Sequence, residues 1–172
     1  ESWDGGIEQQ FAGGAVKVIA TGFLRNTTNQ IDFVSCPSTN PLCTAGKFGV
    51  YDNIARAHAY GLELSGTVQV EQLAVEANYT YTHAENSAPG NVNQGKILAR
   101  RPAHTANLSA TYTWNIPLTT GIGVRYSGDA FDDAGNRFVL NHYTLVDLRA
   151  SWAISDKVDL YGRIENLFDV TY

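Results

Sequence analysis

Apolar and polar residues alternate with a period of two along most of the chain. From Asn107 to Trp114, one parity carries Leu, Ala, Tyr and Trp, while the other carries only Asn, Ser and Thr. Successive side chains of a β-strand point to opposite faces, so this pattern predicts a strand with one apolar and one polar face. The pattern recurs without a competing helical period. It predicts antiparallel strands near residues 2–11, 15–25, 49–70, 73–83, 97–114, 118–128, 139–153 and 158–168.

The connections between these strands alternate in length. Short turns are expected at 12–14, 71–72, 115–117 and 154–157, and long loops at 26–48, 84–96 and 129–138. Outer-membrane barrels have short periplasmic turns and longer extracellular loops, and strands of about ten residues cross a bilayer at a tilt. We therefore predict an all-β fold, an antiparallel transmembrane β-barrel segment whose long loops are extracellular.

Composition narrows the possible partners. Charged residues make up 17% of the chain, the net charge is −5, and the only basic cluster is Arg100–Arg101. Nucleic-acid binding requires concentrated positive charge, so no nucleic-acid partner is expected. No continuous apolar run is long enough for a transmembrane helix.

Aromatic residues on the apolar parity cluster at the ends of the predicted strands. Trp114 and Trp152 precede short turns, whereas Tyr81 and Tyr126 precede long loops. Two aromatic girdles, one at each membrane interface, would have this arrangement. The alternative is that these rings fill the core of a soluble β-sandwich.

The many charged residues on the polar parity count against the sandwich alternative. A hydrated lumen, in which opposite charges pair across strands, accommodates them. The residues expected to face this lumen are Lys17, Glu76, Arg125, Asp147, Arg149, Asp159, Arg163 and Glu165.

The two cysteines bracket a turn-rich segment. Cys36 and Cys43 have no histidine or third cysteine beside them, which argues against a zinc site. A local disulfide in an oxidising compartment is the favoured interpretation, and it would contribute roughly 2–3 kcal/mol on the loop-entropy model. Two reduced surface thiols are the alternative.

Other polar clusters carry weaker signals. Asp129, Asp132 and Asp133 offer oxygen ligands for weak calcium binding, but their spacing is not that of an EF-hand loop, and a solvated loop is the favoured interpretation. The histidines lack metal-ligand spacing and are interpreted as hydrogen-bonded bystanders; they are His58, His83, His104 and His142. No G-x-S-x-G motif is present, so neither an enzyme nor a cofactor is expected.

The strand count leaves the size of the whole barrel open. With periplasmic short turns, both ends of the chain would lie on the long-loop side, unlike a closed eight-stranded barrel. The chain also contains no Met, so we expect a processed or excised part of a larger barrel. The alternatives are a free-standing eight-stranded barrel acting as an anchor or adhesin, an outer-membrane barrel enzyme, and a soluble sandwich.

Several segments resemble the C-terminal barrel region of TonB-dependent outer-membrane receptors, particularly the cobalamin and ferric-siderophore receptors. Residues 51–57 (YDNIARA) with 61–64 (GLEL), 98–104 (LARRPAH) and 143–152 (YTLVDLRASW) resemble barrel strands of that family. The most specific match is the closing motif of Asn166, Leu167, Phe168, Asp169 and Tyr172.

The resemblance implies eight strands of a roughly 22-stranded barrel, without the plug domain and TonB-contacting segment. It also implies energy-coupled import of a scarce large nutrient, such as a ferric siderophore or cobalamin, into a Gram-negative bacterium. The implied partners are outer-membrane lipid, the rest of the barrel and plug, the TonB complex, and a small metal-chelate or corrinoid substrate.

Overall fold

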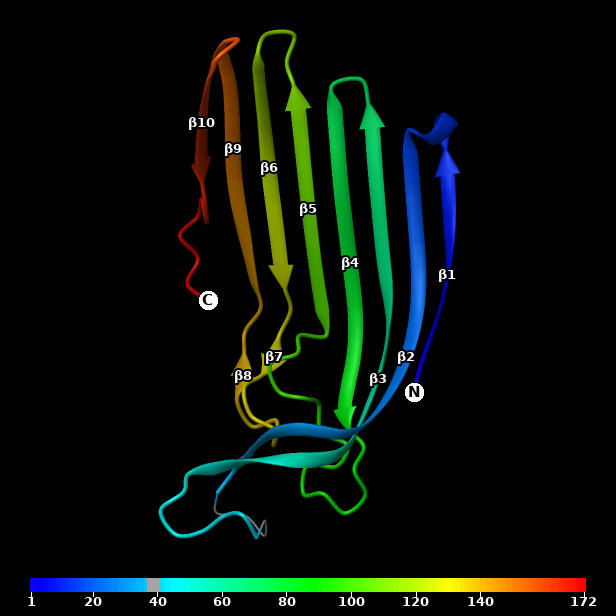
Figure 1. Cartoon of the computed structure of the whole chain (residues 1–172), viewed down its shortest axis with the longest axis vertical. Helices are drawn as coiled ribbons and strands as arrows, with labels where there is room; N and C mark the ends of the chain where they lie inside the picture. Colours follow the sequence, from blue (N-terminus) through cyan, green and yellow to red (C-terminus); the bar gives the residue numbers. More distant parts are fainter. Residues whose placement is uncertain (37–40) are drawn as a thin grey trace.

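The chain folds into one antiparallel sheet. The computed structural model describes residues 1–36 and 41–172, with side chains at all of these positions except 30, 32–35 and 52–55. The eight strands of the sheet are neighbours in chain order (Figure 1). They are β1 (Ser2–Phe11), β2 (Val16–Ser35), β3 (Gly49–Val70), β4 (Leu73–Asn86), β5 (His104–Thr113), β6 (Leu118–Ser127), β9 (Tyr143–Ser155) and β10 (Val158–Ile164).

Two short elements complete the structure. The strands β7 (Ala130–Phe131) and β8 (Val139–Leu140) form a separate two-stranded ribbon, and η1 (Ala12–Gly14) is a single 3-10 turn. The all-β, antiparallel prediction is confirmed. Among the described residues, no helix has the length and hydrophobicity needed to cross a membrane.

The short turns gather at one end of the sheet and the long connections at the other (Figure 1). Left-handed backbone conformations make the tight turns possible. Ala12, Gly13 and Gly14 have φ values of 51°, 66° and 96°, and Glu71 has φ 47° between β3 and β4. Such conformations reverse the chain within two or three residues.

The described sheet is open. Its strand order runs from β1 to β10, and these two strands are its edges. The central strands β4 and β5 lie nearer the viewer than both edge strands, so the sheet is curved (Figure 1). The alternative of a closed eight-stranded barrel is therefore wrong for this structure.

The predicted loop 26–48 differs most from the structure. β2 continues to Ser35 and pairs with β3 as far as Gly49, so most of this region is a two-stranded arm that bends away from the sheet (Figure 1). Alternation fades after residue 25, because a two-stranded arm beyond the sheet has no need of a continuous apolar face. Residues 37–40 of the predicted loop lie outside the described residues.

Other strand boundaries also differ. β4 extends to Asn86, whereas β5 begins at His104 rather than near 97, because Arg100 adopts a left-handed conformation (φ 56°) and Pro102 cannot donate to the ladder. The predicted strand 139–153 divides into β8 and β9, and residues 165–168 form a turn instead of extending β10.

Buried apolar side chains concentrate at the long-loop end. Ala57, Ala84 and Leu98 form a small cluster that Ala59 packs against. Within the described part of the chain, the other buried apolar residues are Ala88 and Leu145. The body of the sheet has no comparable core, so its large apolar side chains are left for surroundings outside this chain.

Candidate functional site

The strand register places the residues expected in the lumen on one face of the sheet. Lys17, Glu76 and Asp147 occupy one row across β2 to β9, in which each residue is a register partner of the next strand's residue. Arg125 and Arg149 belong to the adjacent rows of the same parity, and Arg163 lies opposite Arg149. We call this surface the polar face.

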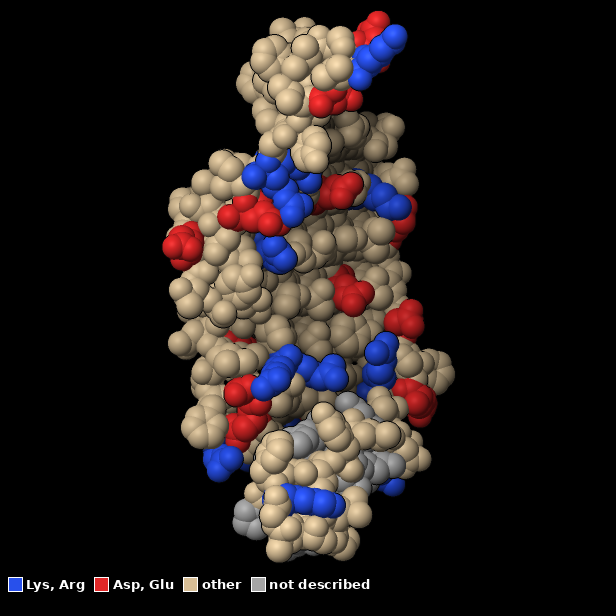
Figure 2. Space-filling view, turned by 60° about the vertical axis from the view of Figure 1, so that its left-hand side comes forward, with Lys and Arg blue, Asp and Glu red and all other residues tan. Residues whose placement is uncertain are grey.

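Opposite charges meet on the polar face. Lys17 Nζ lies 2.9 Å from Glu8 Oε2, Arg125 Nη2 lies 3.4 Å from Asp147 Oδ2, and Arg163 pairs with Glu165. Figure 2 shows charged side chains of both signs mainly in two bands, with further charged side chains between the bands and at the upper tip. Exposed pairs such as these each contribute about 0–1 kcal/mol, so they add little stability and mainly make the surface hydrophilic.

Arg149 is held differently. A Cβ atom at Gly121 on β6 would lie 2.5 Å from Arg149 Nε, so the absence of a side chain there makes room for the arginine. Arg149 Nη2 then donates to Ser109 Oγ at 3.0 Å and Thr111 Oγ1 at 2.7 Å on β5. The Arg149 side chain therefore reaches from β9 across β6 to β5, where two hydroxyl groups hold its guanidinium.

A hollow of about 570 Å³ opens on the polar face towards the long loops. Its lining includes Asp4, Arg25, Glu63 and Arg101, from β1, β2, β3 and the segment before β5. The sequence interpretation did not single out Asp4 or Arg25, and it named Glu63 only within the 61–64 motif. Their position on the polar parity of strands that prove to be neighbours is the signal that could have found them.

The long loops beside this hollow are joined to each other. Asn136 Oδ1 accepts from the Ile97 amide at 2.8 Å, and Asn136 Nδ2 donates to the Ile97 carbonyl at 2.8 Å. The Arg100 amide donates to the Phe131 carbonyl at 2.6 Å, and Arg100 Nε lies 2.8 Å from Asp132 Oδ1. We call these contacts the loop clasp.

The three aspartates considered for calcium binding face different partners. Asp129 accepts from the His142 amide at 2.7 Å, Asp132 pairs with Arg100, and Asp133 pairs with Arg137 at 2.9 Å. The Arg137 guanidinium and the amides of Phe138 and Arg137 hold the pKa of Asp133 at about 2. Among the described residues, no group of three or more His, Cys, Asp or Glu side chains forms a metal cage.

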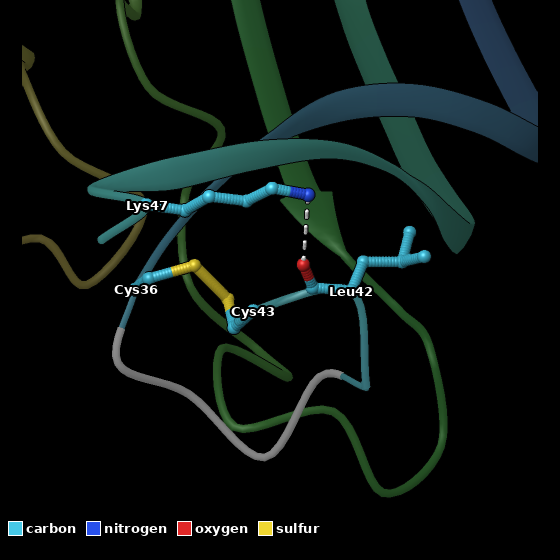
Figure 3. The surroundings of a disulfide bond; sticks show 4 residues. All are labelled: Cys36, Leu42, Cys43 and Lys47. Carbon is cyan, nitrogen blue, oxygen red and sulfur yellow. Dashed lines mark hydrogen bonds between the residues drawn. A yellow bond between two sulfur atoms is a disulfide. The ribbon is translucent and has the colours of Figure 1, made fainter. Parts of the chain in front are cut away.

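Cys36 and Cys43 form a disulfide at the end of the arm. Their Cα atoms are 5.6 Å apart, and Lys47 Nζ donates to the Leu42 carbonyl at 3.4 Å across the same loop (Figure 3). The disulfide closes the end of the β2–β3 arm, which bends away from the sheet (Figure 1).

The opposite surface, the apolar face, carries the aromatic residues expected at the interfaces. Trp114 and Trp152 lie beside the short turns, with exposed fractions of 47% and 53%. Trp114 Nε1 donates to Thr120 Oγ1 at 3.0 Å, and its ring meets Tyr112 edge-on. Tyr81 and Tyr126 share this parity towards the long loops.

The closing motif forms a compact turn against β9. The Asn166 side chain accepts from the Val170 amide at 2.9 Å and donates to the Val170 carbonyl at 3.0 Å. The Asn166 backbone amide donates to Asp147 Oδ1 at 2.9 Å, and the Leu167 backbone amide donates to the Val146 carbonyl of β9 at 2.8 Å. Asp169 has φ 51°, and the Tyr172 ring stacks on Tyr143. Leu167 and Phe168 are exposed, with fractions of 39% and 69%.

The family model for the β-barrel of TonB-dependent receptor-like proteins matches residues 1–167. The chain belongs to this family. The resemblance seen in its motifs is thereby confirmed.

Individual relatives agree with this assignment. The chain is 27% identical over 168 residues to the iron-regulated outer membrane virulence protein of Vibrio cholerae, covering 91% of this chain and 25% of that protein. It is 32% identical over 123 residues to the vitamin B12 transporter BtuB of Photobacterium profundum, covering 70% and 19%. The chain thus spans about a quarter or less of these relatives.

Solved structures show the same fold. The siderophore receptor PiuA of Acinetobacter baumannii superposes with a TM-score of 0.77 at 22% identity, over 98% of this chain and 24% of that one. By name, these relatives are an outer membrane virulence protein, a vitamin B12 transporter and a siderophore receptor.

Proposed function

We propose that this chain is part of a receptor that imports a scarce, large nutrient across the outer membrane of a Gram-negative bacterium, driven by the TonB complex. The observation that carries the proposal is the match to the receptor barrel over residues 1–167. The apolar and polar faces of the curved sheet support it, because a receptor wall separates lipid from a hydrated lumen.

The two ends of the sheet would have different roles. The short turns would lie in the periplasm, while the disulfide-closed arm and the loop clasp would be extracellular. The hollow lined by Arg25 and Arg101 would then form part of a binding vestibule. The plug domain and the TonB-contacting segment would belong to other parts of the protein.

We further propose a ferric siderophore or cobalamin as the substrate class. This rests on the relatives, which include a siderophore receptor and a vitamin B12 transporter. The hollow carries carboxylates as well as guanidinium groups, so it can hydrogen-bond a polar chelate without demanding one sign of charge.

Uptake measurements test the proposal. A strain lacking the parent gene should lose accumulation of one radiolabelled ferric siderophore or of labelled cobalamin, and a strain lacking TonB should lose the same uptake. The intact gene should restore it. If accumulation of every siderophore and corrinoid tested is unchanged, the substrate class is wrong.

The proposed vestibule has a test of its own, which measures how tightly cells bind the same labelled substrate. Replacing Arg25 and Arg101 together with Gln should weaken binding of the identified substrate to cells at least tenfold, because each contact to a charged group contributes about 1.5–3 kcal/mol. Lys157→Gln, at a short turn, is the matched control and should leave binding unchanged.

A further inference from the structure

Rings of histidine and tyrosine form a belt across the apolar face at its long-loop end. The chain contains four histidines, and all of them lie in this belt. Centroid distances are 5.7 Å for His58–Tyr60, 4.9 Å for Tyr60–His83, 5.2 Å for Tyr81–His104 and 6.4 Å for Tyr126–His142. Together with Tyr79, these residues are called the histidine–tyrosine belt.

The register explains how residues far apart in sequence form one belt. Tyr60 on β3 is the partner of His83 on β4, and Tyr81 on β4 is the partner of His104 on β5. The Gly128 amide bonds to the His104 carbonyl, which continues the row towards His142. The belt shares the parity of the apolar side chains nearer the middle of the sheet, such as Leu62 and Leu108.

The charged groups around the belt are few. Glu85 Oε2 lies 3.2 Å from His83 Nε2, and Asp129 Oδ1 lies 3.1 Å from His142 Nδ1. Glu1 also faces this side, where its carboxylate accepts from Trp3 Nε1. Within the described strands, Arg56 is the only arginine or lysine on this parity.

Two histidines have no acidic partner. His58 Nδ1 lies 2.7 Å from Oδ1 of the Asn26 side chain, and His104 Nδ1 lies 2.7 Å from the Tyr79 hydroxyl oxygen. Each uses one ring nitrogen in this contact, and among the described residues no side chain hydrogen-bonds to Nε2 of either ring. Protonation would therefore give each ring an N–H donor directed away from the protein's own acceptors.

We propose that the belt is a protonation-dependent binding surface for the phosphate groups of lipid headgroups in the outer leaflet. This inference rests on the membrane placement in the proposed function. Tyrosine rings are favoured at the depth of the headgroups, and imidazolium forms charge-assisted hydrogen bonds to phosphate oxygens. While the rings are neutral, Glu1, Glu85 and Asp129 outweigh Arg56. Protonation of four rings reverses the sign of the belt.

The test uses the full-length receptor reconstituted in phosphatidylcholine bilayers. Spin-labelled phosphatidic acid and spin-labelled phosphatidylcholine report how strongly each lipid associates with the protein surface. At about pH 5.5, phosphatidic acid should be preferred by about fivefold for each protonated unpaired ring, and the preference should fall sharply at about pH 8.

Variants separate the belt from other charges. The double substitution His58→Phe and His104→Phe keeps an aromatic ring at each position and removes both unpaired imidazoles. Most of the pH-dependent part of the preference should then be lost, and the remainder should come from His83 and His142. The matched control Arg56→Gln removes a permanent charge, so it should lower the preference at both pH values and leave its pH dependence intact.

The outcomes are distinct. If the unmodified receptor prefers phosphatidic acid equally at the two pH values, the proposal is overturned without any variant. An unchanged pH dependence in the double variant also overturns it. Substrate uptake is measured on the same proteins. Normal uptake without a lipid preference rejects only the belt, whereas a pH-dependent preference without uptake rejects only the proposed transport function.

Discussion

The wall of the sheet and its long-loop end are stabilised in different ways. Along the wall, backbone ladders join consecutive strands, and large apolar side chains such as Leu64 and Leu160 are exposed at 37% and 57%. At the loop end, a buried cluster, the loop clasp and a disulfide connect segments of the chain to one another. The exposed apolar side chains of the wall therefore rely on surroundings outside this chain, whereas the loop end carries its own supporting contacts.

The largest expected effect comes from a glycine in the wall. A Cβ atom at Gly61 would collide with the Tyr81 carbonyl and lie 2.7 Å from the Phe23 ring. Gly61→Val should destabilise the ladder by about 1–3 kcal/mol or more and reduce the amount of folded receptor. Heat-modifiable mobility of the full-length protein in gels measures this. Gly162→Val, where a Cβ meets nothing within 4 Å, is the control. Equal losses in both would contradict the explanation.

The disulfide should matter locally. Replacing Cys36 and Cys43 together with Ser removes a restraint of roughly 2–3 kcal/mol from the tip of the arm. Added protease should then cut the arm faster on intact cells, while the heat-modifiable behaviour of the barrel stays the same. A loss of folded barrel would show that the arm and the wall are not independent.

The loop clasp should give a smaller effect. Asn136→Ala removes both hydrogen bonds to Ile97, so the segment 87–103 should be held to the 129–138 loop less strongly by about 1–2 kcal/mol. The measurement is the cleavage rate between residues 87 and 103. Asn141→Ala is the matched control, because the Asn141 side chain makes no hydrogen bond in the described structure. Faster cleavage in the control would indicate a general loosening instead.

Acid should have the smallest effect, confined to the 129–138 loop and the residues that directly follow it. Arg137 holds the pKa of Asp133 at about 2, whereas an aspartate in the unfolded chain has a pKa of about 4. The stabilisation of the loop by the Asp133 carboxylate is therefore complete above about pH 4 and is lost as the pH falls towards 2. A spin label at Asn141→Cys should become mobile over that window. In Arg137→Gln, the transition should move to higher pH, and an unchanged midpoint would contradict the pairing.

The sequence predicted the wall better than the loop end. Strict alternation around Leu108 and Tyr112 defined both the strand and its two faces, because successive residues of a strand point to opposite faces and here differ in polarity. The register then brought Lys17, Glu76 and Asp147 into one row, as expected of residues that share a face.

The loop end was predicted less well for a physical reason. The contacts of Asn136 with Ile97 and of Asp132 with Arg100 join residues that no periodic pattern relates. The arm retains backbone pairing after alternation has faded, so periodicity alone placed its boundary too early. The hollow required knowledge of which strands are neighbours, and the histidine–tyrosine belt appears only once the register is known.

The opposite environments of the two faces are the central claim, and site-directed spin labelling along β5 tests it most directly. Single labels at Asn107, Leu108, Ser109 and Ala110 of the full-length receptor in bilayers should alternate in collision rate. Labels at 108 and 110 should collide mainly with oxygen dissolved in lipid. Labels at 107 and 109 should collide mainly with a water-soluble nickel chelate. Uniform accessibility, or alternation with the opposite phase, would contradict the account.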